Sequence, residues 1–342
     1  MSRSAFTPAP DLRTPRLAIT LGDPRGIGPE IVAAALANPT VRERCDIIVV
    51  GPTGTLVPVQ EPVGKWTTDQ RVAQGSAQGS AQGSAQGSAQ DSAQGASQSV
   101  ARAGALSGAA IERAVQLAID GVVDGIVTAP IDKAALLAGG YDYPGHTEML
   151  AELTHSRVAM MLASDRLRVV LATTHVALRD VPRALTAQVI ADAAQVTRAG
   201  LRDWFGIAEP RIALCALNPH AGDHGRFGDE DDTLLAPVAH DNGLLGPFPA
   251  DTVFVRAMRG AFDAVIAPYH DVGMTAIKVA SFGSAVNVTL GLPFPRTSPD
   301  HGTALDIAGQ GIADPASFIE AVLLCATLVD RIRAHRPARP PT

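Results

Sequence analysis

The sequence predicts an α/β protein with a largely parallel sheet, and three observations carry this prediction. Short apolar runs of strand length alternate with segments of helical periodicity along most of the chain, which is the pattern of βα units. The chain has 342 residues, of which 46% are hydrophobic, and can therefore bury a large core. Its apolar runs are far shorter than the roughly 20 residues that a membrane-spanning helix needs.

The strands are expected where a short apolar run is bounded by polar or turn residues. These runs are Leu17–Leu21, Asp46–Val50, Gly125–Thr128, Arg157–Leu162, Leu167–Ala172, Arg211–Leu217, Ala264–Ala267 and Ala285–Leu290. Helices are expected at Pro29–Ala37, Ala105–Asp120, Asp132–Ala138, Thr147–Leu153, Thr186–Phe205, Glu230–Asn242 and Pro315–Ala334. The alternation of the two kinds of segment assigns the fold class.

A tetrapeptide, Ala-Gln-Gly-Ser, is repeated four times in register within residues 73–96 and is followed by two degraded copies. The tract has no apolar face to bury, and its glycines raise the entropy that ordering would cost. Its period is too short for a solenoid, whose repeats are roughly 20 to 50 residues long. We expect a flexible low-complexity surface loop, an inert insertion rather than a tether, between residues 17–72 and 97–334. Residues 1–16 and 335–342 are expected to be a disordered leader and tail.

Charge and cysteine usage argue against several classes of function. The formal net charge is −6, from 28 Lys and Arg against 34 Asp and Glu, and no basic block appears. We therefore expect neither a nucleic-acid partner nor a membrane partner. Cys45, Cys215 and Cys325 form no CxxC pair, so neither a disulfide framework nor a cysteine zinc site is expected. The first residues lack the apolar core of a secretory signal, and we expect a reducing, cytoplasmic location.

Three histidines follow predicted strands, at the edge where open α/β sheets bind ligands. His175 follows RVVLATT, His220 follows IALCALNP and His270 follows AVIAPY. Three neutral imidazoles that converge at one edge would hold a divalent metal ion and leave a position open for substrate. Each histidine alone is more simply explained as a structural residue, but three at equivalent positions favour a ligand set.

Carboxylates stand close to these histidines along the chain. Asp271 directly follows His270, and Asp223 and Asp229 lie within ten residues of His220. Such a carboxylate can orient an imidazole or act as a general base. Asp229 immediately precedes a predicted helix, so we interpret it as an N-cap.

Three further polar segments could contact a ligand. The first is GDPRGIGPE, residues 22–30, which could expose backbone N–H groups to an anion. It lacks both the GxGxxG spacing and the Walker A lysine. Ordinary βα turn chemistry explains it equally well. GHTE, residues 145–148, places His146 and Thr147 at a helix start, where capping is the alternative explanation. Lys278, Asn287 and Arg296 surround one apolar strand and suit a phosphate or carboxylate, although solvated surface charge explains each of them alone.

Eight blocks follow one another along the chain: LGDPRGIGPE, VTAPIDK, YPGHTE, LATTHVALRDV, LNPHAGDHGRFGDED, GPFPADTVF, YHDVGMTAIK and VNVTLGLPFPRTSPDHGTALDIAG. In this order they resemble the 4-hydroxythreonine-4-phosphate dehydrogenase family of vitamin B6 biosynthesis, from about Leu17 to Ala334 without the repeat tract. The resemblance implies a two-domain α/β/α fold like that of isocitrate and isopropylmalate dehydrogenases, with the active site between the two lobes. It also implies NAD or NADP, one divalent metal ion (zinc, magnesium or cobalt), and a homodimer whose subunits share the active sites.

The resemblance also implies roles for individual residues. His175, His220 and His270 would bind the metal, His146 and Thr147 would contact a small phosphorylated substrate, and Lys278, Asn287 and Arg296 would bind it from the neighbouring chain's side. The C3 hydroxyl of 4-phosphooxy-L-threonine would be oxidised, giving 2-amino-3-oxo-4-(phosphooxy)butanoate, which loses CO2 to form 3-amino-2-oxopropyl phosphate. Asp271, Asp251 and His146 remain alternatives for the base.

Other functions compete with this one. A paralogue could oxidise D-threonate or D-erythronate 4-phosphate, or a dihydrodiol, although the GHTE and RTSPDHGTA blocks suit a phosphorylated, amino-acid-like substrate better than a dihydrodiol. A metal-dependent hydrolase or lyase could use the same three histidines without a nicotinamide. A metal-binding scaffold without catalysis fits least well, because several polar clusters follow predicted strands.

Overall fold

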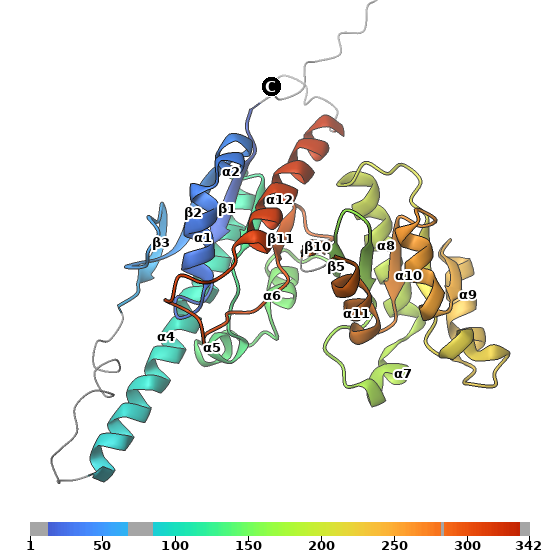
Figure 1. The fold of residues 1–342 in the computed structure, drawn as a ribbon, viewed down its shortest axis with the longest axis horizontal. Coiled ribbons are helices and arrows are strands. Elements are labelled where there is room, and N and C mark those ends of the chain that lie inside the picture. The colour runs from blue at the N-terminus through green and yellow to red at the C-terminus, as the bar shows by residue number, and fades with distance from the viewer. Residues whose placement is uncertain (1–12, 68–84, 282–283, 336–342) are drawn as a thin grey trace, which may run out of the picture.

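The computed structural model describes residues 13–67, 85–281 and 284–335, with the backbone alone for residues 85–93. Most of the predicted leader (1–16) and tail (335–342), and residues 73–84 of the repeat tract (73–96), therefore lie outside the described residues. Within them, eleven strands form one sheet in the order β3-β2-β1-β4-β11-β10-β5-β6-β9-β7-β8 (Figure 1). The α/β fold class is confirmed.

The strands are β1 (Arg16–Thr20), β2 (Asp46–Thr53), β3 (Glu61–Lys65), β4 (Gly125–Thr128), β5 (Ala159–Ala163), β6 (Arg168–Leu171), β7 (Ile212–Cys215), β8 (Leu245–Phe248), β9 (Ala264–Ala267), β10 (Val286–Leu290) and β11 (Arg296–Pro299). All eight predicted strands are present, and β4 and β9 have the predicted bounds. Sequence reasoning missed β3, β8 and β11.

The helices are α1 (Gly28–Ala37), α2 (Pro39–Arg44), α4 (Ala85–Ile119), α5 (Lys133–Ala138), α6 (His146–Leu153), α7 (Val181–Ala184), α8 (Ala187–Asp203), α9 (Ala236–Asp241), α10 (Ala250–Met258), α11 (His270–Ser281) and α12 (Ala316–His335). Short helical turns are η1 (Leu178–Asp180), η2 (Pro219–Asp223) and the π-helical η3 (Asp231–Leu235). The seven predicted helices are present, the one at Glu230–Asn242 as η3 followed by α9, whereas α2, α7, α10 and α11 were missed.

The sheet is parallel on both flanks and antiparallel in the middle. β10 pairs antiparallel with both β11 and β5, and β5 pairs antiparallel with β6. The two hairpins need only short connections, at residues 291–295 and 164–167, whereas a parallel pair needs a long crossover. The prediction of a largely parallel sheet therefore holds for the flanks and is corrected for the centre.

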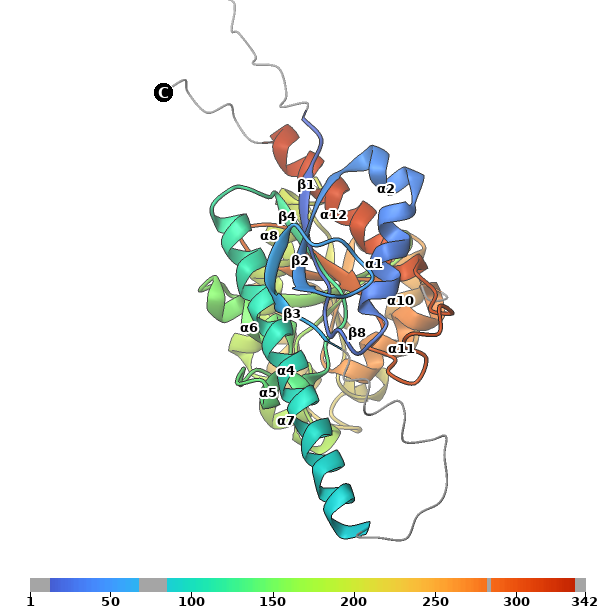
Figure 2. The ribbon, with the colours of Figure 1, turned by 90° about the vertical axis from the view of Figure 1, so that its left-hand side faces the viewer.

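Helices cover both faces of the sheet. Around β1 and β2, α4, α5 and α6 lie on one side, whereas α1 and α12 lie on the other (Figure 2). The large apolar core lies between these layers and includes fully buried side chains such as Leu17, Ile126 and Phe318. A second cluster, with Phe254 and Val265, packs α10 and α11 against β9. No helix of the described residues combines the length and apolarity needed to cross a membrane.

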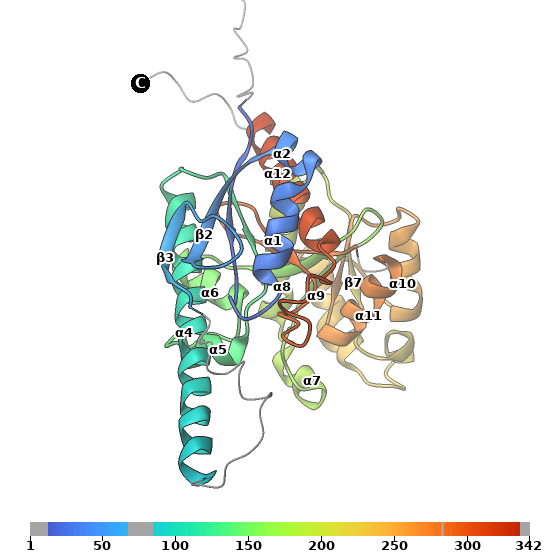
Figure 3. The ribbon, with the colours of Figure 1, turned by 60° about the vertical axis from the view of Figure 1, so that its left-hand side comes forward.

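Helix α4 begins at Ala85, well before the predicted start at Ala105, and its first half projects beyond α5 (Figure 3). This corrects the expectation of a loop for residues 85–96, while residues 73–84 lie outside the described residues. Alanine and glutamine are good helix formers, and the costly nucleus is already provided by the apolar residues further along, so the helix extends backwards in spite of Gly87 and Gly95.

Candidate active site

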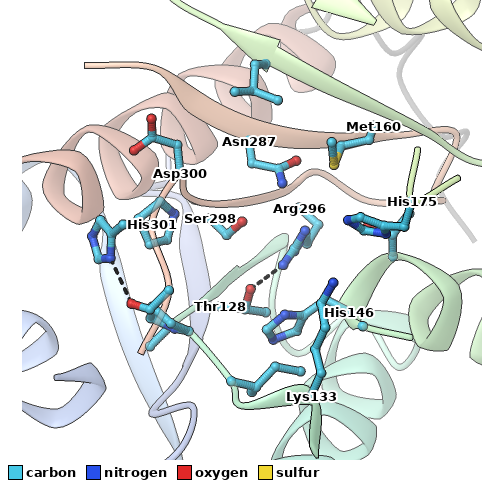
Figure 4. Close-up of a pocket in the computed structure, with 18 of the residues that line it drawn as sticks. Thr128, Lys133, His146, Met160, His175, Asn287, Arg296, Ser298, Asp300 and His301 are labelled. Carbon is cyan, nitrogen blue, oxygen red and sulfur yellow. Dashed lines mark hydrogen bonds between the residues drawn. The ribbon is translucent and has the colours of Figure 1, made fainter. Parts of the chain in front are cut away.

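A cavity of about 290 Å³ lies where the two flanks of the sheet meet (Figure 4). One wall comes from the end of β4, from β11, and from the starts of α5 and α6. The other comes from β5, β10, the start of α11 and the loop after β6. The polar residues that line it are Thr128, Lys133, His146, Thr147, Glu148, His175, His270, Asn287, Arg296, Ser298, Asp300 and His301.

Four buried polar atoms in the lining have no hydrogen-bond partner within the described part of the chain. They are His146 Nε2, Asn287 Oδ1, Arg296 Nε and His301 Nε2. Buried polar groups in native proteins are nearly always paired, because an unpaired one loses its hydration without compensation. Atoms of this kind that share one cavity indicate a polar ligand.

Arg296 is the most deeply buried charge in the cavity wall, with 2% of its surface exposed. Its guanidinium donates to the hydroxyls of Thr289 and Thr128, and no carboxylate among the described residues forms an ion pair with it. Burial lowers the pKa of Arg296 from 12.5 to about 9, so the group remains positive at neutral pH. A buried cation without a counterion calls for an anionic ligand.

His146 begins α6 and is partly buried, with its Nε2 atom shielded from solvent. Burial, together with repulsion from Arg296 and Lys133, holds the pKa of His146 well below its usual value, so the free protein carries it as a neutral imidazole. Its neighbours Gly145 and Thr147 also line the cavity. The predicted contact of GHTE with a ligand is therefore compatible with the position of the segment.

His175 and His270 come together at the edge that the strand-end argument indicated. Strands β6 and β9 are parallel neighbours, and the two imidazole centroids lie 5.9 Å apart. The Nδ1 atom of His270 lies 2.8 Å from Oδ1 of Asp271. Burial, followed by repulsion from Lys133, lowers the pKa of His175. Two imidazoles, one oriented by a carboxylate, fit part of a divalent metal site.

His220 does not join this pair in a single chain. It is exposed, does not line the cavity and packs against Phe227, with 6.3 Å between ring centroids. Over the described residues, no group of three or more His, Cys, Asp or Glu side chains is placed to hold a metal ion. The chain therefore brings together two of the three predicted ligands.

The loop that carries His220 has an unusual backbone. Five successive residues, 220–224, have φ between 46° and 80°, and only Gly222 among them lacks a Cβ. The left-handed conformation costs other residues roughly 1–2 kcal/mol each. Such strain persists only where the surroundings impose it, and it clusters at functional sites.

Asp231 imposes part of this loop conformation. Its side chain is 1% exposed, and its two oxygens accept the backbone N–H groups of Leu217 (2.8 Å) and Asn218 (3.0 Å). Asn218 in turn donates to Glu230 at 2.7 Å. The carboxylate thus fixes the chain where it leaves β7 and enters the left-handed turn.

Replacing Asp231 with alanine is expected to lower the free energy of unfolding by about 2–4 kcal/mol, because two backbone N–H groups lose their acceptors. Denaturant unfolding measures the change. The exposed neighbour Asp232 provides the control, and D232A is expected to stay within about 0.5 kcal/mol of the parent. Equal denaturant midpoints for D231A and D232A would show that Asp231 does not anchor the loop.

The remaining predicted residues divide between the cavity and the surface. Asn287 lines the cavity, whereas Lys278 and Asp251 are exposed on α11 and α10 and lie outside it. Asp271 is 86% exposed and touches the cavity only through His270. Within one chain, the predicted set is therefore split between two places.

The GDPRGIGPE segment packs against residues next to the cavity wall without entering the cavity. None of its residues lines the cavity. Buried Asp23 pairs with Arg25 at 2.6 Å, and a Cβ on Gly22 would lie 2.2 Å from the carbonyl oxygen of Pro130. The N–H of Ile27 donates to Thr303, just beyond His301. Of its two interpretations, turn chemistry accounts for the segment.

Sequence reasoning assigned no role to Lys133, Asp300 or His301, which all line the cavity. Lys133 lies five residues beyond β4, and Asp300 directly follows β11. The strand-end rule would have found Lys133, because β4 was predicted. It could not have found the other two, because β11 was missed.

Comparisons with known proteins agree with this geometry. A family model described as pyridoxal phosphate biosynthetic protein PdxA matches residues 43–325. The 4-hydroxythreonine-4-phosphate dehydrogenase of Geobacter metallireducens is 43% identical over 324 residues, which cover 92% of this chain and 95% of the relative. The crystal structure of 4-hydroxythreonine-4-phosphate dehydrogenase from Klebsiella pneumoniae gives a TM-score of 0.75 at 35% identity and covers 94% of this chain and 99% of that one. A terephthalate 1,2-cis-dihydrodiol dehydrogenase from Burkholderia xenovorans gives 0.58 at 27% identity, with 92% and 98% covered.

Proposed function

Because the chain belongs to the PdxA family of pyridoxal phosphate biosynthetic proteins, we propose that it oxidises 4-phosphooxy-L-threonine at C3 with NAD or NADP. Relatives that are 43% and 52% identical to it are named 4-hydroxythreonine-4-phosphate dehydrogenase, which is an oxidoreductase activity. The dihydrodiol alternative has the weaker likeness in both sequence and structure. The hydrolase, lyase and sugar-acid alternatives have no specific observation in their favour.

The observation that carries the proposal is the buried guanidinium of Arg296, whose Nε has no partner among the described residues, in a cavity with three other unpaired polar atoms. The substrate carries a phosphate, a carboxylate, an ammonium and a hydroxyl group. These groups can supply a counterion for Arg296 and hydrogen-bond partners for His146 and Asn287. A cavity of this size and polarity fits a small, multiply charged substrate of this kind.

In the reaction, the C3–H bond breaks and its hydrogen leaves as hydride to the nicotinamide, while the hydroxyl proton passes to a base. Of the three alternative bases, His146 alone lines the cavity with an unpaired nitrogen, so we assign the proton to its Nε2. Bound substrate anions would offset the repulsion from Arg296 and Lys133 and raise the pKa of His146 toward a useful range. The product is a β-keto acid, whose decarboxylation gives 3-amino-2-oxopropyl phosphate.

A divalent zinc, magnesium or cobalt ion is proposed as a cofactor, with His175 and His270 as two of its ligands. When bound, such an ion lowers the pKa of a hydroxyl that it coordinates. The Asp271 carboxylate orients His270 so that Nε2 is left to face the cavity. The identity of the ion is not fixed by imidazole ligands, which suit several metals.

We propose a homodimer with a shared active site because one chain alone does not bring all the predicted site residues together. His220 and Lys278 lie outside the cavity of their own chain, yet both belong to the proposed site. They would reach the cavity of a second copy, with Asp231 holding the His220 loop in shape.

The cytoplasm is proposed as the compartment, because the buried cysteines Cys45, Cys215 and Cys325 are free thiols, as a reducing environment favours.

The proposal is tested by following nicotinamide reduction with 4-phosphooxy-L-threonine and with D-threonate 4-phosphate, each with NAD and with NADP in the presence of a divalent metal. We expect kcat/KM to favour the amino-acid substrate. A preference for D-threonate 4-phosphate would assign the chain to sugar-acid oxidation instead. Turnover without nicotinamide reduction would assign it to hydrolysis or elimination.

A further inference from the structure

One cation in the cavity wall has been assigned no contact with the substrate so far. Lys133 is the first residue of α5 and lines the cavity with His146 and Arg296. Its side chain runs beside the His146 ring (Figure 4). The residue is exposed at the mouth of the cavity, and no salt bridge joins it to a carboxylate of the described residues. Its nearest acidic neighbour in sequence, Asp132, is engaged with the N–H of Ala135 at 2.8 Å.

The start of α6 lies beside this lysine. A Cβ built on Gly145 would lie 3.5 Å from Cε of Lys133 and 3.6 Å from Oε2 of Glu148, so the lysine stem and this carboxylate both reach the N-cap of the helix. The helix has eight residues, and no side chain caps its first N–H groups. Free N–H groups at a helix start attract anions. The buried, unpartnered Nε2 of His146 opens at the same place, which independently indicates a ligand.

The position of Lys133 is fixed by the packing of its helix. Asp132 caps α5, and a Cβ on Gly104 of α4 would lie only 1.7 Å from the carbonyl oxygen of Ala135. The two helices can therefore approach so closely only with glycine at position 104. The lysine is carried on a tightly packed element rather than on a free loop.

We propose that Lys133 is a further substrate-binding residue, which holds the phosphate group of the substrate together with the first N–H groups of α6. This proposal rests on the proposed function for the identity of the substrate. A phosphate monoester carries a charge of about −1.5 to −2 at neutral pH, more than one buried guanidinium neutralises. Lys133 supplies the second positive charge from the same chain, and the three terminal oxygens suit donors that converge from several directions.

The first test needs no turnover. The chain contains three lysines, Lys65, Lys133 and Lys278, so acylation by an amine-reactive reagent can be followed at each site by mass spectrometry. We expect inorganic phosphate to slow the acylation of Lys133 severalfold and to leave that of Lys65 unchanged. Equal rates at Lys133 with and without phosphate would overturn the proposal, and this holds even if the proposed substrate proves wrong.

The second test compares K133M with K65M, a matched change at an exposed lysine of β3. We expect K133M to raise KM for 4-phosphooxy-L-threonine roughly 10- to 100-fold, the range of one charge-assisted hydrogen bond, with a smaller effect on kcat. K65M should behave as the parent, and K133R should recover part of the loss. Circular dichroism of each variant confirms folding.

Inhibition experiments distinguish whether Lys133 binds the phosphate or the carboxylate of the substrate. Inorganic phosphate should inhibit K133M far less than the parent, whereas 4-hydroxy-L-threonine, which lacks the phosphate, should inhibit both equally. If K133M instead weakens 4-hydroxy-L-threonine and leaves phosphate inhibition intact, Lys133 binds the carboxylate and the proposal is wrong. If the parent itself does not oxidise the substrate, the proposed function fails, and the acylation test alone decides the role of Lys133.

Discussion

R296M is expected to lower kcat/KM by about a thousandfold and at the same time to raise the free energy of unfolding. The loss of activity follows because a buried, charge-assisted contact to an anionic substrate is removed and nothing replaces it. The gain in stability follows because folding no longer buries a cation without a counterion. The pKa of Arg296 falls from 12.5 to about 9, and this drop corresponds to several kcal/mol of unfavourable burial.

Steady-state kinetics and denaturant unfolding measure the two effects on the same preparation. We expect the gain in stability to be about 1–2 kcal/mol, because the hydroxyls of Thr128 and Thr289 lose their donor and offset part of the gain. R296K is the control, since it keeps the charge but cannot serve both hydroxyls, and it should be poorly active without being stabilised. A variant R296M that is both active and less stable would contradict the role of Arg296 as a substrate site.

Mixed dimers of H175A and H220A are expected to recover activity that neither variant has alone. If His220 enters the cavity of the second copy, one of the two sites in a mixed dimer contains both mutations and the other contains neither. Random association then makes half of the dimers mixed, so the unfractionated mixture should show about one quarter of the parent activity and the isolated mixed dimer about one half. Each pure variant should be inactive, because a lost ligand weakens the metal site.

The combination of H175A with H270A provides the matched control. Both histidines line the cavity of their own chain, so each site of a mixed dimer lacks one of them and no activity should return. The variants are co-expressed with different tags, and the mixed species is isolated before the assay. Absence of recovery in the H175A and H220A mixture would mean that His220 does not act across subunits.

The sequence was most informative where polar residues follow a regular apolar strand. His175 and His270 were predicted to meet because they follow strands of one edge, and β6 and β9 are indeed parallel neighbours. His220 obeys the same rule along the chain, but five residues in left-handed conformation redirect the loop after β7. Since that conformation is unfavourable for residues with a Cβ, no sequence pattern predicts it.

Two missed elements carry important site residues. Arg296 lies on β11, whose sequence RTSP has no apolar run to mark a strand, because its polar side chains face a cavity and a buried network. His270 begins α11, where Gly273 lowers the helix propensity. A Cβ at Gly273 would lie 2.7 Å from Cδ2 of Leu171, so the glycine lets the helix pack on β6. In both cases tertiary contacts override the local signal.

The projecting half of α4 has a consequence for how the protein varies in nature. Coding DNA with tandem repeats gains and loses whole units by slippage during replication, and residues 85–88 of the helix are one unit of the Ala-Gln-Gly-Ser tract. A unit added within the helix would lengthen it by about 6 Å. Among the side chains of α4 that the structure describes, from residue 94 onward, the first buried one is Ala103. Proteins with different copy numbers should therefore share the same folded core and differ in the length of the projecting helix.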